Sequence, residues 1–129
     1  MGFMFPDARA AFYELVPRAV DPAPVPYFQL VVDFADNLPA ALIYRVGGEE
    51  SGPFRQDRIN VDVYANGSTA ANRVANEIRA FLAGQSHDFG DPAQLLDQVE
   101  VEVIPTEAPY MSDTVNVVSA TYRVDTRAL

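Results

Sequence analysis

The chain has 129 residues, of which 49 % are hydrophobic, and a formal charge of −9 from 18 acidic and 9 basic residues. This size and composition predict one domain that buries a core of its own. The acidic balance argues against a nucleic-acid clamp, which needs a basic surface, but is compatible with a protein past which DNA slides. The absence of cysteine excludes disulfides and thiolate chemistry. Because we find neither a signal-peptide pattern nor an apolar run of about 20 residues, we expect a soluble protein made inside a cell.

The N-terminal part predicts one helix and an extended connector. Asp7 can cap a helix that runs to about Val16, because apolar residues recur there at helical spacing and Pro17 disfavours continuation. Residues 21–26 contain three prolines and predict an extended connector. Residues 27–34 fit a strand or a helix face, and their aromatic and β-branched content favours a strand.

The middle of the chain predicts a hairpin. Residues 40–46 and 58–64 alternate apolar and polar side chains, as half-buried strands do. Between them, residues 47–54 contain the glycines, acids and proline typical of a loop. We therefore expect a long hairpin loop with an acidic tip, in which Phe54 either folds back onto the sheet or awaits a partner.

A long amphipathic helix follows the second strand. The turn at residues 65–68 contains Asn-Gly, and Ser68 or Thr69 can cap the helix. Gly84 stands where a left-handed residue ends a helix. The apolar positions form one stripe: Ala71, Val74, Ala75, Ile78, Phe81 and Leu82.

The C-terminal third predicts further strands. Residues 91–96 indicate a short helix with proline at its first position, after a loop at residues 85–90. Residues 99–103 alternate as a strand, and residues 105–110 indicate a second long loop. Residues 114–125 form the last expected strand.

In that last strand the apolar phase changes between Val117 and Val118, which predicts a β-bulge or a bend. Together the elements predict an α+β domain: a single antiparallel or mixed sheet with two main helices on one face.

Few residues suggest chemistry. His87 beside Asp88 could transfer protons, although a lone loop histidine is usually a solvated residue. Asp62, Glu100 and Glu102 could converge on a hard cation if their strands are neighbours, but a solvated acidic sheet face is the favoured interpretation. Since adjacent like charges destabilise a sheet, we expect an arginine near them, from this chain or from another subunit. We assign no catalytic residue, metal ligand or cofactor and expect no enzymatic activity.

Several patterns in order resemble the tail terminator, or tail-completion, proteins of long-tailed bacteriophages. The resemblance covers most of residues 38–127, which form the expected α+β core, after an N-terminal helix at about residues 7–16. It rests on Leu38-Pro39, the strand ending at residues 44–48, the acidic loop, the strand at residues 57–65, the helix at residues 70–79, and the ending at residues 121–124 with Arg127.

This resemblance implies a mechanical function in the virion. Proteins of this family form a ring, typically a hexamer, that caps the head-proximal end of the tail tube and ends tube polymerisation. The implied partners are further copies of the chain, the major tail tube protein and the head–tail connector or head-closure protein. DNA passes through the lumen without specific binding. The implied location is the tail–neck junction of a virion made in the cytoplasm of a bacterial host.

The alternatives are another neck or head-closure adaptor of similar build, or a small α+β enzyme or ligand-binding domain. The hairpin tip at residues 47–57 and the loop at residues 107–113 are the expected contacts with neighbouring rings, because long loops on small rigid domains often bind partners. All nine basic residues are arginines, which suit subunit interfaces. The hypothetical interface residues are Glu49, Glu50, Phe54, Arg55, Asp62, Tyr64, Glu100, Glu102, Tyr110, Arg123 and Arg127.

Overall fold

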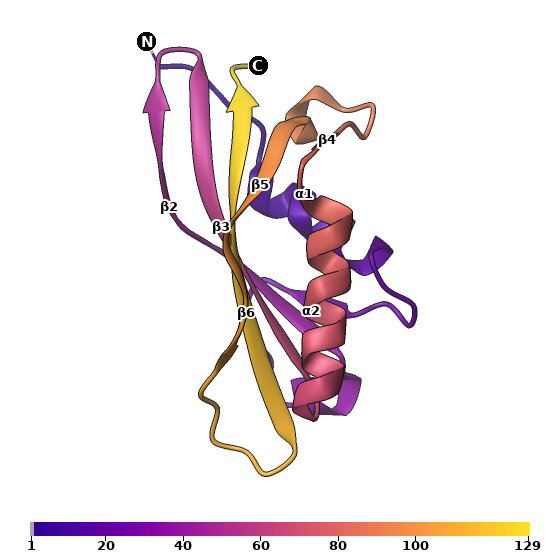
Figure 1. Cartoon of the computed structure of the whole chain (residues 1–129). Coiled ribbons are helices and arrows are strands. Elements are labelled where there is room, and N and C mark those ends of the chain that lie inside the picture. Colours follow the sequence, from indigo (N-terminus) through magenta and orange to yellow (C-terminus); the bar gives the residue numbers. More distant parts are fainter. Residues whose placement is uncertain (1) are drawn as a thin grey trace.

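The computed structural model describes residues 2–129 and contains one curled, mixed six-stranded sheet and two α-helices (Figure 1), which confirms the α+β class. Neither helix of the described chain is long and apolar enough to cross a membrane. The elements are α1 (Ala8–Leu15), η1 (Val16–Arg18), β1 (Val25–Tyr27), η2 (Phe34–Asn37), β2 (Ala40–Ser51), β3 (Phe54–Asn66), α2 (Ser68–Leu82), β4 (Gln85–His87), η3 (Pro92–Gln94), β5 (Leu96–Ala108) and β6 (Val115–Arg127), where η marks 3₁₀ helices.

The sheet has the order β1-β2-β3-β6-β5-β4. β1 runs parallel to β2, and all other neighbours are antiparallel. The four long strands form the body of the sheet, and the two strands of three residues, β1 and β4, cover only short parts of its edges. Figure 1 shows the β2–β3 turn and both chain termini at one end of the sheet, and the β5–β6 loop at the other.

The expected loop at residues 47–54 was wrong, because both strands of the hairpin continue through it. β2 and β3 pair as far as Ser51 and Phe54, so the connection is only Gly52-Pro53. Gly47 and Gly48 lie within β2 at positive φ, with one register shift between Arg45 and Gly47. Glycine allows this irregular backbone without breaking the strand. The result is a two-stranded ribbon rather than a long loop.

The α2 helix follows the predicted apolar stripe. Ala71, Val74, Ala75, Ile78 and Leu82 are buried, and Phe81 is partly buried against the same cluster. The predicted serine or threonine cap was wrong: the N-cap is Gly67, at φ +93°, and no side chain caps it. After the helix, the amide of Gly84, at φ +73°, donates a hydrogen bond of 2.7 Å to the carbonyl of Val99.

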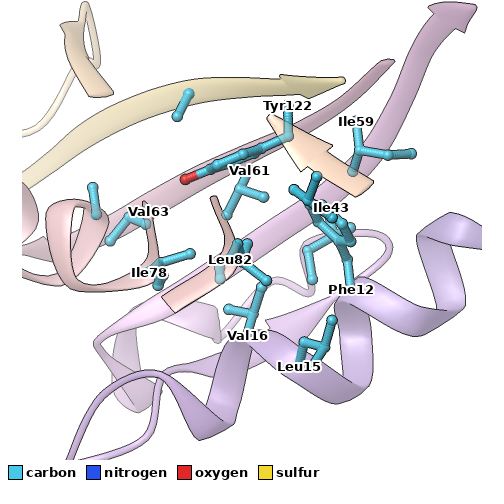
Figure 2. Close-up of a cluster of buried hydrophobic side chains, with 14 of the residues drawn as sticks. Phe12, Leu15, Val16, Ile43, Ile59, Val61, Val63, Ile78, Leu82 and Tyr122 are labelled. Carbon is cyan, nitrogen blue, oxygen red and sulfur yellow. The ribbon is translucent and has the colours of Figure 1, made fainter. Parts of the chain in front are cut away.

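The main core combines buried residues of the two helices with alternate residues of the long strands (Figure 2). Phe12 of α1 contacts Tyr122 of β6 edge to face, with ring centroids 5.7 Å apart. The apolar face of β3 and the apolar stripe of α2 both belong to this cluster. The buried strand residues are Ala41, Ile43, Ile59, Val61, Val63, Ala65, Leu96, Val99, Val118, Ala120, Tyr122 and Val124.

The N-terminal helix is confirmed, with the Asp7 carboxylate accepting a hydrogen bond of 3.1 Å from the amide of Ala10. The strand expected at residues 27–34 was wrong: strand β1 ends at Tyr27 and a 3₁₀ helix begins at Phe34. Only some of the aromatic and apolar residues of this segment reflect tertiary packing, since Val32 is fully exposed. Several of them cover a second, smaller cluster, which consists of Ala40, Tyr64, Val115 and Val117 with Tyr27, Leu30, Phe34, Leu38, Leu42 and Ala108 around it.

This second cluster also explains the phase change in β6. The register of β6 with β3 is unbroken, so the predicted bulge between Val117 and Val118 was wrong. Val118 belongs to the main core and Val117 to the second cluster. The sheet is therefore buried on both faces at this end, and consecutive valines are both inside. The irregularities fall on β5 instead, between Val101 and Thr106.

The remaining connections are shorter than expected. β5 extends to Ala108, so most of the loop expected at residues 105–110 is strand. The loop expected at residues 85–90 contains β4, and the short helix expected at residues 91–96 is one 3₁₀ turn. The side chain of Asp91 caps that turn by accepting a hydrogen bond of 3.0 Å from the amide of Ala93.

Candidate functional site

A polar network crosses β2, β3 and β6 on the face that carries Asp62. The Asp62 carboxylate accepts hydrogen bonds from the Tyr44 hydroxyl at 3.0 Å, the Asn60 amide at 2.9 Å and the Ser119 hydroxyl at 2.6 Å. The Thr121 hydroxyl donates to the side-chain oxygen Oδ1 of Asn60. The alternation of β3 positions these groups, because Asn60 and Asp62 are out of phase with its buried valines.

The network satisfies its own polar groups. Burial, with the neighbouring Asp62 charge, raises the pKa of Tyr44, so its hydroxyl stays a donor at neutral pH. With three donors, the Asp62 carboxylate is held by the fold rather than left free to react. The arrangement fixes the lateral alignment of three strands.

Three cross-strand ion pairs connect β5 to other strands, two to its neighbour β6 and one across β6 to β3. Arg58 Nε lies 2.7 Å from Glu102, and Arg123 pairs with Glu100. Arg127 contacts both oxygens of Asp97, at 2.8 and 3.0 Å. The expected arginine partners are thus present, and they come from the same chain.

The hypothetical hard-cation site is not assembled. Glu100 and Glu102 are paired with arginines, whereas Asp62 belongs to the hydrogen-bonded network. Among residues 2–129, no group of three or more histidine, cysteine or acidic side chains could hold a metal ion.

The hairpin end of the sheet brings five of the predicted interface residues together. An open groove of about 470 Å³ is lined by Glu49, Glu50, Phe54, Arg55 and Arg127, among others. Arg55 lies 3.4 Å from Glu50, so these charges are partly neutralised. Phe54 is 58 % exposed and does not fold back onto the sheet.

Asp57, at the base of this ribbon, is a buried carboxylate that sequence reasoning missed. It is 3 % exposed, with Arg55 at 3.2 Å and Arg45 at 3.6 Å. Burial raises its pKa, against the opposing effect of the two arginines. A signal was available: Asp57 is in phase with Ile59 and Val61, and so had to point toward the core face.

At the opposite end, Tyr64 and Tyr110 are in contact, with ring centroids 5.5 Å apart. Tyr64 is 7 % exposed, because Phe34 also packs against it, and burial raises its pKa to about 12. Within this chain Tyr64 is thus part of the second cluster, while Tyr110 and the fully exposed Met111 face outward.

His87 has a structural contact. Its Nε2 lies 3.1 Å from the carbonyl oxygen of Leu82, the last residue of α2, and its ring packs on Phe81. Asp88 instead accepts a hydrogen bond from the amide of Gly90 at 2.8 Å. The histidine therefore satisfies a helix C-terminus, where terminal carbonyls lack intrahelical partners.

Taken together, the predicted interface residues form three groups: a groove at the hairpin end, a charge-paired polar face, and an aromatic contact at the loop end. No protein-family model and no curated protein matches the chain.

Proposed function

We propose that this protein is a structural subunit of a phage neck, a tail terminator that assembles into a ring and caps the head-proximal end of the tail tube. The observation that carries the proposal is the presence of exposed apolar side chains at both ends of the sheet. Such residues on a small domain indicate protein contacts. An element stacked between two partners needs one such surface at each end.

At the hairpin end the exposed residues come from three parts of the chain. The amide of Ala128 donates to the carbonyl of Pro53, and the amide of Leu129 to that of Met4, both at 2.8 Å, so the termini lie beside the turn. Figure 1 shows this grouping at the top of the molecule. The exposed apolar residues there are Phe3, Met4, Phe54 and Leu129.

At the other end, the β5–β6 connection carries Tyr110 and Met111. In the proposal, the hairpin tip at residues 47–57 and the loop at residues 107–113 contact the adjoining rings, one in the tail tube and one in the head connector. The assembly occurs in the bacterial host, and the protein stays at the tail–neck junction of the virion.

The polar face supports a lumen past which DNA slides. In the proposed arrangement both helices pack on one face of the sheet, which leaves the opposite face for the inside of the ring. Its arginines, Arg58 and Arg123, are each paired with a glutamate, and the whole chain has a charge of −9. A surface without free basic groups does not retain the phosphate backbone.

Mass measurement and negative-stain imaging of the purified protein, with and without tail-tube protein, test the proposal. We expect rings, either alone or on tube ends, and tubes of defined length when the protein is present. Phe54→Ser should weaken this effect, whereas Ala80→Ser, an exposed position on α2, should not. A stable monomer with no effect on tube length would contradict the proposal, and small-molecule binding by that monomer would favour a ligand-binding domain.

A further inference from the structure

Two strand edges of the sheet are open. β1 pairs only with residues 40–42 of β2, which leaves the outer side of Ile43–Ser51 without a neighbouring strand in the described chain, residues 2–129. β4 reaches β5 only between Leu96 and Val99, which leaves Glu100–Ala108 equally open. Each open edge is nine residues long. Unpaired backbone N–H and C=O groups over such a length are a template for another strand.

We propose that these two edges bind each other between copies of this chain, so that β2 of one subunit pairs with β5 of the next. This inference rests on the proposed ring and names its subunit interface. β2 is separated from β5 by three antiparallel steps in the order β2-β3-β6-β5, so the two strands run in opposite directions. A neighbour related by rotation about a ring axis therefore presents β5 antiparallel to β2. Antiparallel pairing is the more stable ladder.

A head-to-tail contact suits these edges better than a contact between like edges. Pairing β5 with β5 would leave β2 open and would bring together two strands that each carry three glutamates, Glu100, Glu102 and Glu107. In a closed head-to-tail ring both edges are covered in every subunit. Full overlap of the nine-residue edges also places Gly47 opposite Ile104. The exposed β-branched side chains Val46, Val103 and Ile104 then lie at the new contact.

The two edges are staggered along the strands. Across the ladder, Gly47 is level with Arg58, Arg123 and Glu100. Ile104 is level with Val61, about three residues from Arg58 along the regular strand β3. A shift of about 10 Å over four strands about 4.8 Å apart gives a strand tilt of about 28°. This tilt is shallower than the roughly 35–45° typical of closed barrels.

The β5 edge also carries features that restrict pairing. Pro105 lacks a donor, and the register of β5 shifts twice between Val101 and Thr106. Such features protect edges from uncontrolled association. The ladder between subunits is therefore interrupted at Pro105 and continues on either side of it.

Disulfide trapping tests the interface, because the natural chain has no cysteine. Val46→Cys is combined in turn with Val103→Cys, Pro105→Cys or Glu107→Cys, which sample neighbouring registers. The matched control combines Val46→Cys with Ala80→Cys on α2, and Val46→Cys alone reports contact between two β2 edges. Each variant is oxidised with and without tail-tube protein, then examined on a non-reducing gel and by negative stain.

We expect a ladder of covalent multimers for at least one β2–β5 combination, with no ladder for the α2 control. Rings without such a ladder would overturn the inference and leave the proposed function standing. A β2–β5 ladder without rings or any effect on tube length would support the edge pairing and refute the proposed function. Covalent dimers of the Val46→Cys single variant would overturn the inference, because they would show that two β2 edges bind each other. The inference would also fail if Val46→Cys formed a disulfide only with a cysteine variant of the tube protein, because the tube protein would then occupy the β2 edge.

Discussion

We expect the substitution of tyrosine by phenylalanine to have opposite effects on stability on the two faces of the sheet. Tyr122 is 0 % exposed, and its hydroxyl has no hydrogen-bond partner among the described residues. Figure 2 shows this oxygen among aliphatic side chains. Tyr44, in contrast, donates to Asp62 at 3.0 Å and accepts from Asn60 at 3.0 Å.

The magnitudes follow from these partners. An unsatisfied buried hydroxyl costs roughly 1–3 kcal/mol, so Tyr122→Phe should raise the free energy of unfolding by about 1 kcal/mol while keeping the ring contact with Phe12. Tyr44→Phe removes hydrogen bonds on a partly exposed face and should lower the free energy of unfolding by about 1 kcal/mol. The two variants should therefore differ by about 2 kcal/mol in stability, with wild type between them.

Urea unfolding followed by circular dichroism measures this difference. With an m value of roughly 2 kcal/mol per molar, the two midpoints should be separated by about 1 M. Equal m values are the control that only stability has changed. Destabilisation by Tyr122→Phe as large as that by Tyr44→Phe would refute the reasoning, since it would mean that the Tyr122 hydroxyl has a favourable partner.

Three further predictions concern the core, the buried carboxylate and the ribbon. Ile78→Asp places a charge at a fully buried site and should leave the chain unfolded in circular dichroism; soluble, ring-forming protein would contradict this. Asp57 has a raised pKa in the folded state, so its ionisation costs stability as pH rises above its unfolded value. The stability of wild type relative to Asp57→Asn, measured in urea, should thus increase as pH falls from 7 to 4, and a decrease would overturn the assignment. Gly48→Ala should destabilise more than Gly47→Ala in thermal unfolding, because only at Gly48 would the new Cβ lie 2.2 Å from the Gln56 carbonyl oxygen; equal losses would show that backbone strain alone decides.

Local periodicity predicted the parts of the fold whose two faces have different environments. β3 and α2 each have one apolar face against the main core, so their patterns could be recognised directly. Phe28, Leu30, Val32 and Phe34 also alternate as in a strand, yet their backbone is irregular, and of these four only Leu30 and Phe34 pack on the second cluster. The strand-like composition of residues 28–34 therefore indicated neither the backbone conformation nor uniform burial, since Phe28, Val31 and Val32 are exposed.

The glycines of the hairpin led to the opposite error, since they predicted a loop where the structure has strand. Gly47-Gly48 has the local character of a turn, yet β3 lies alongside it and pairs with Gly48 through Asp57. Non-local hydrogen bonds thus override the local preference, and the loop becomes a ribbon. Of the candidate site, the polar face could be predicted by alternation. The ion-pair partners on this face could not be predicted, because Arg58 and Glu102 are 44 positions apart in the chain. Only the order of the strands in the sheet brings them together.

The loop end of the sheet is more deeply buried than the hairpin end. At the loop end, Val117 and Val118 are both buried because packed clusters cover both faces. At the hairpin end, Asp57 takes the place of an apolar residue on the core face, and the ribbon carries exposed Phe54 and charged side chains. The ribbon thus has less apolar burial to hold it, and local stability follows such burial. If the ring forms as proposed, pairing of the β2 edge with a neighbouring β5 would order this weaker end, so the surface that meets the next ring would reach its final shape only after the subunits have assembled.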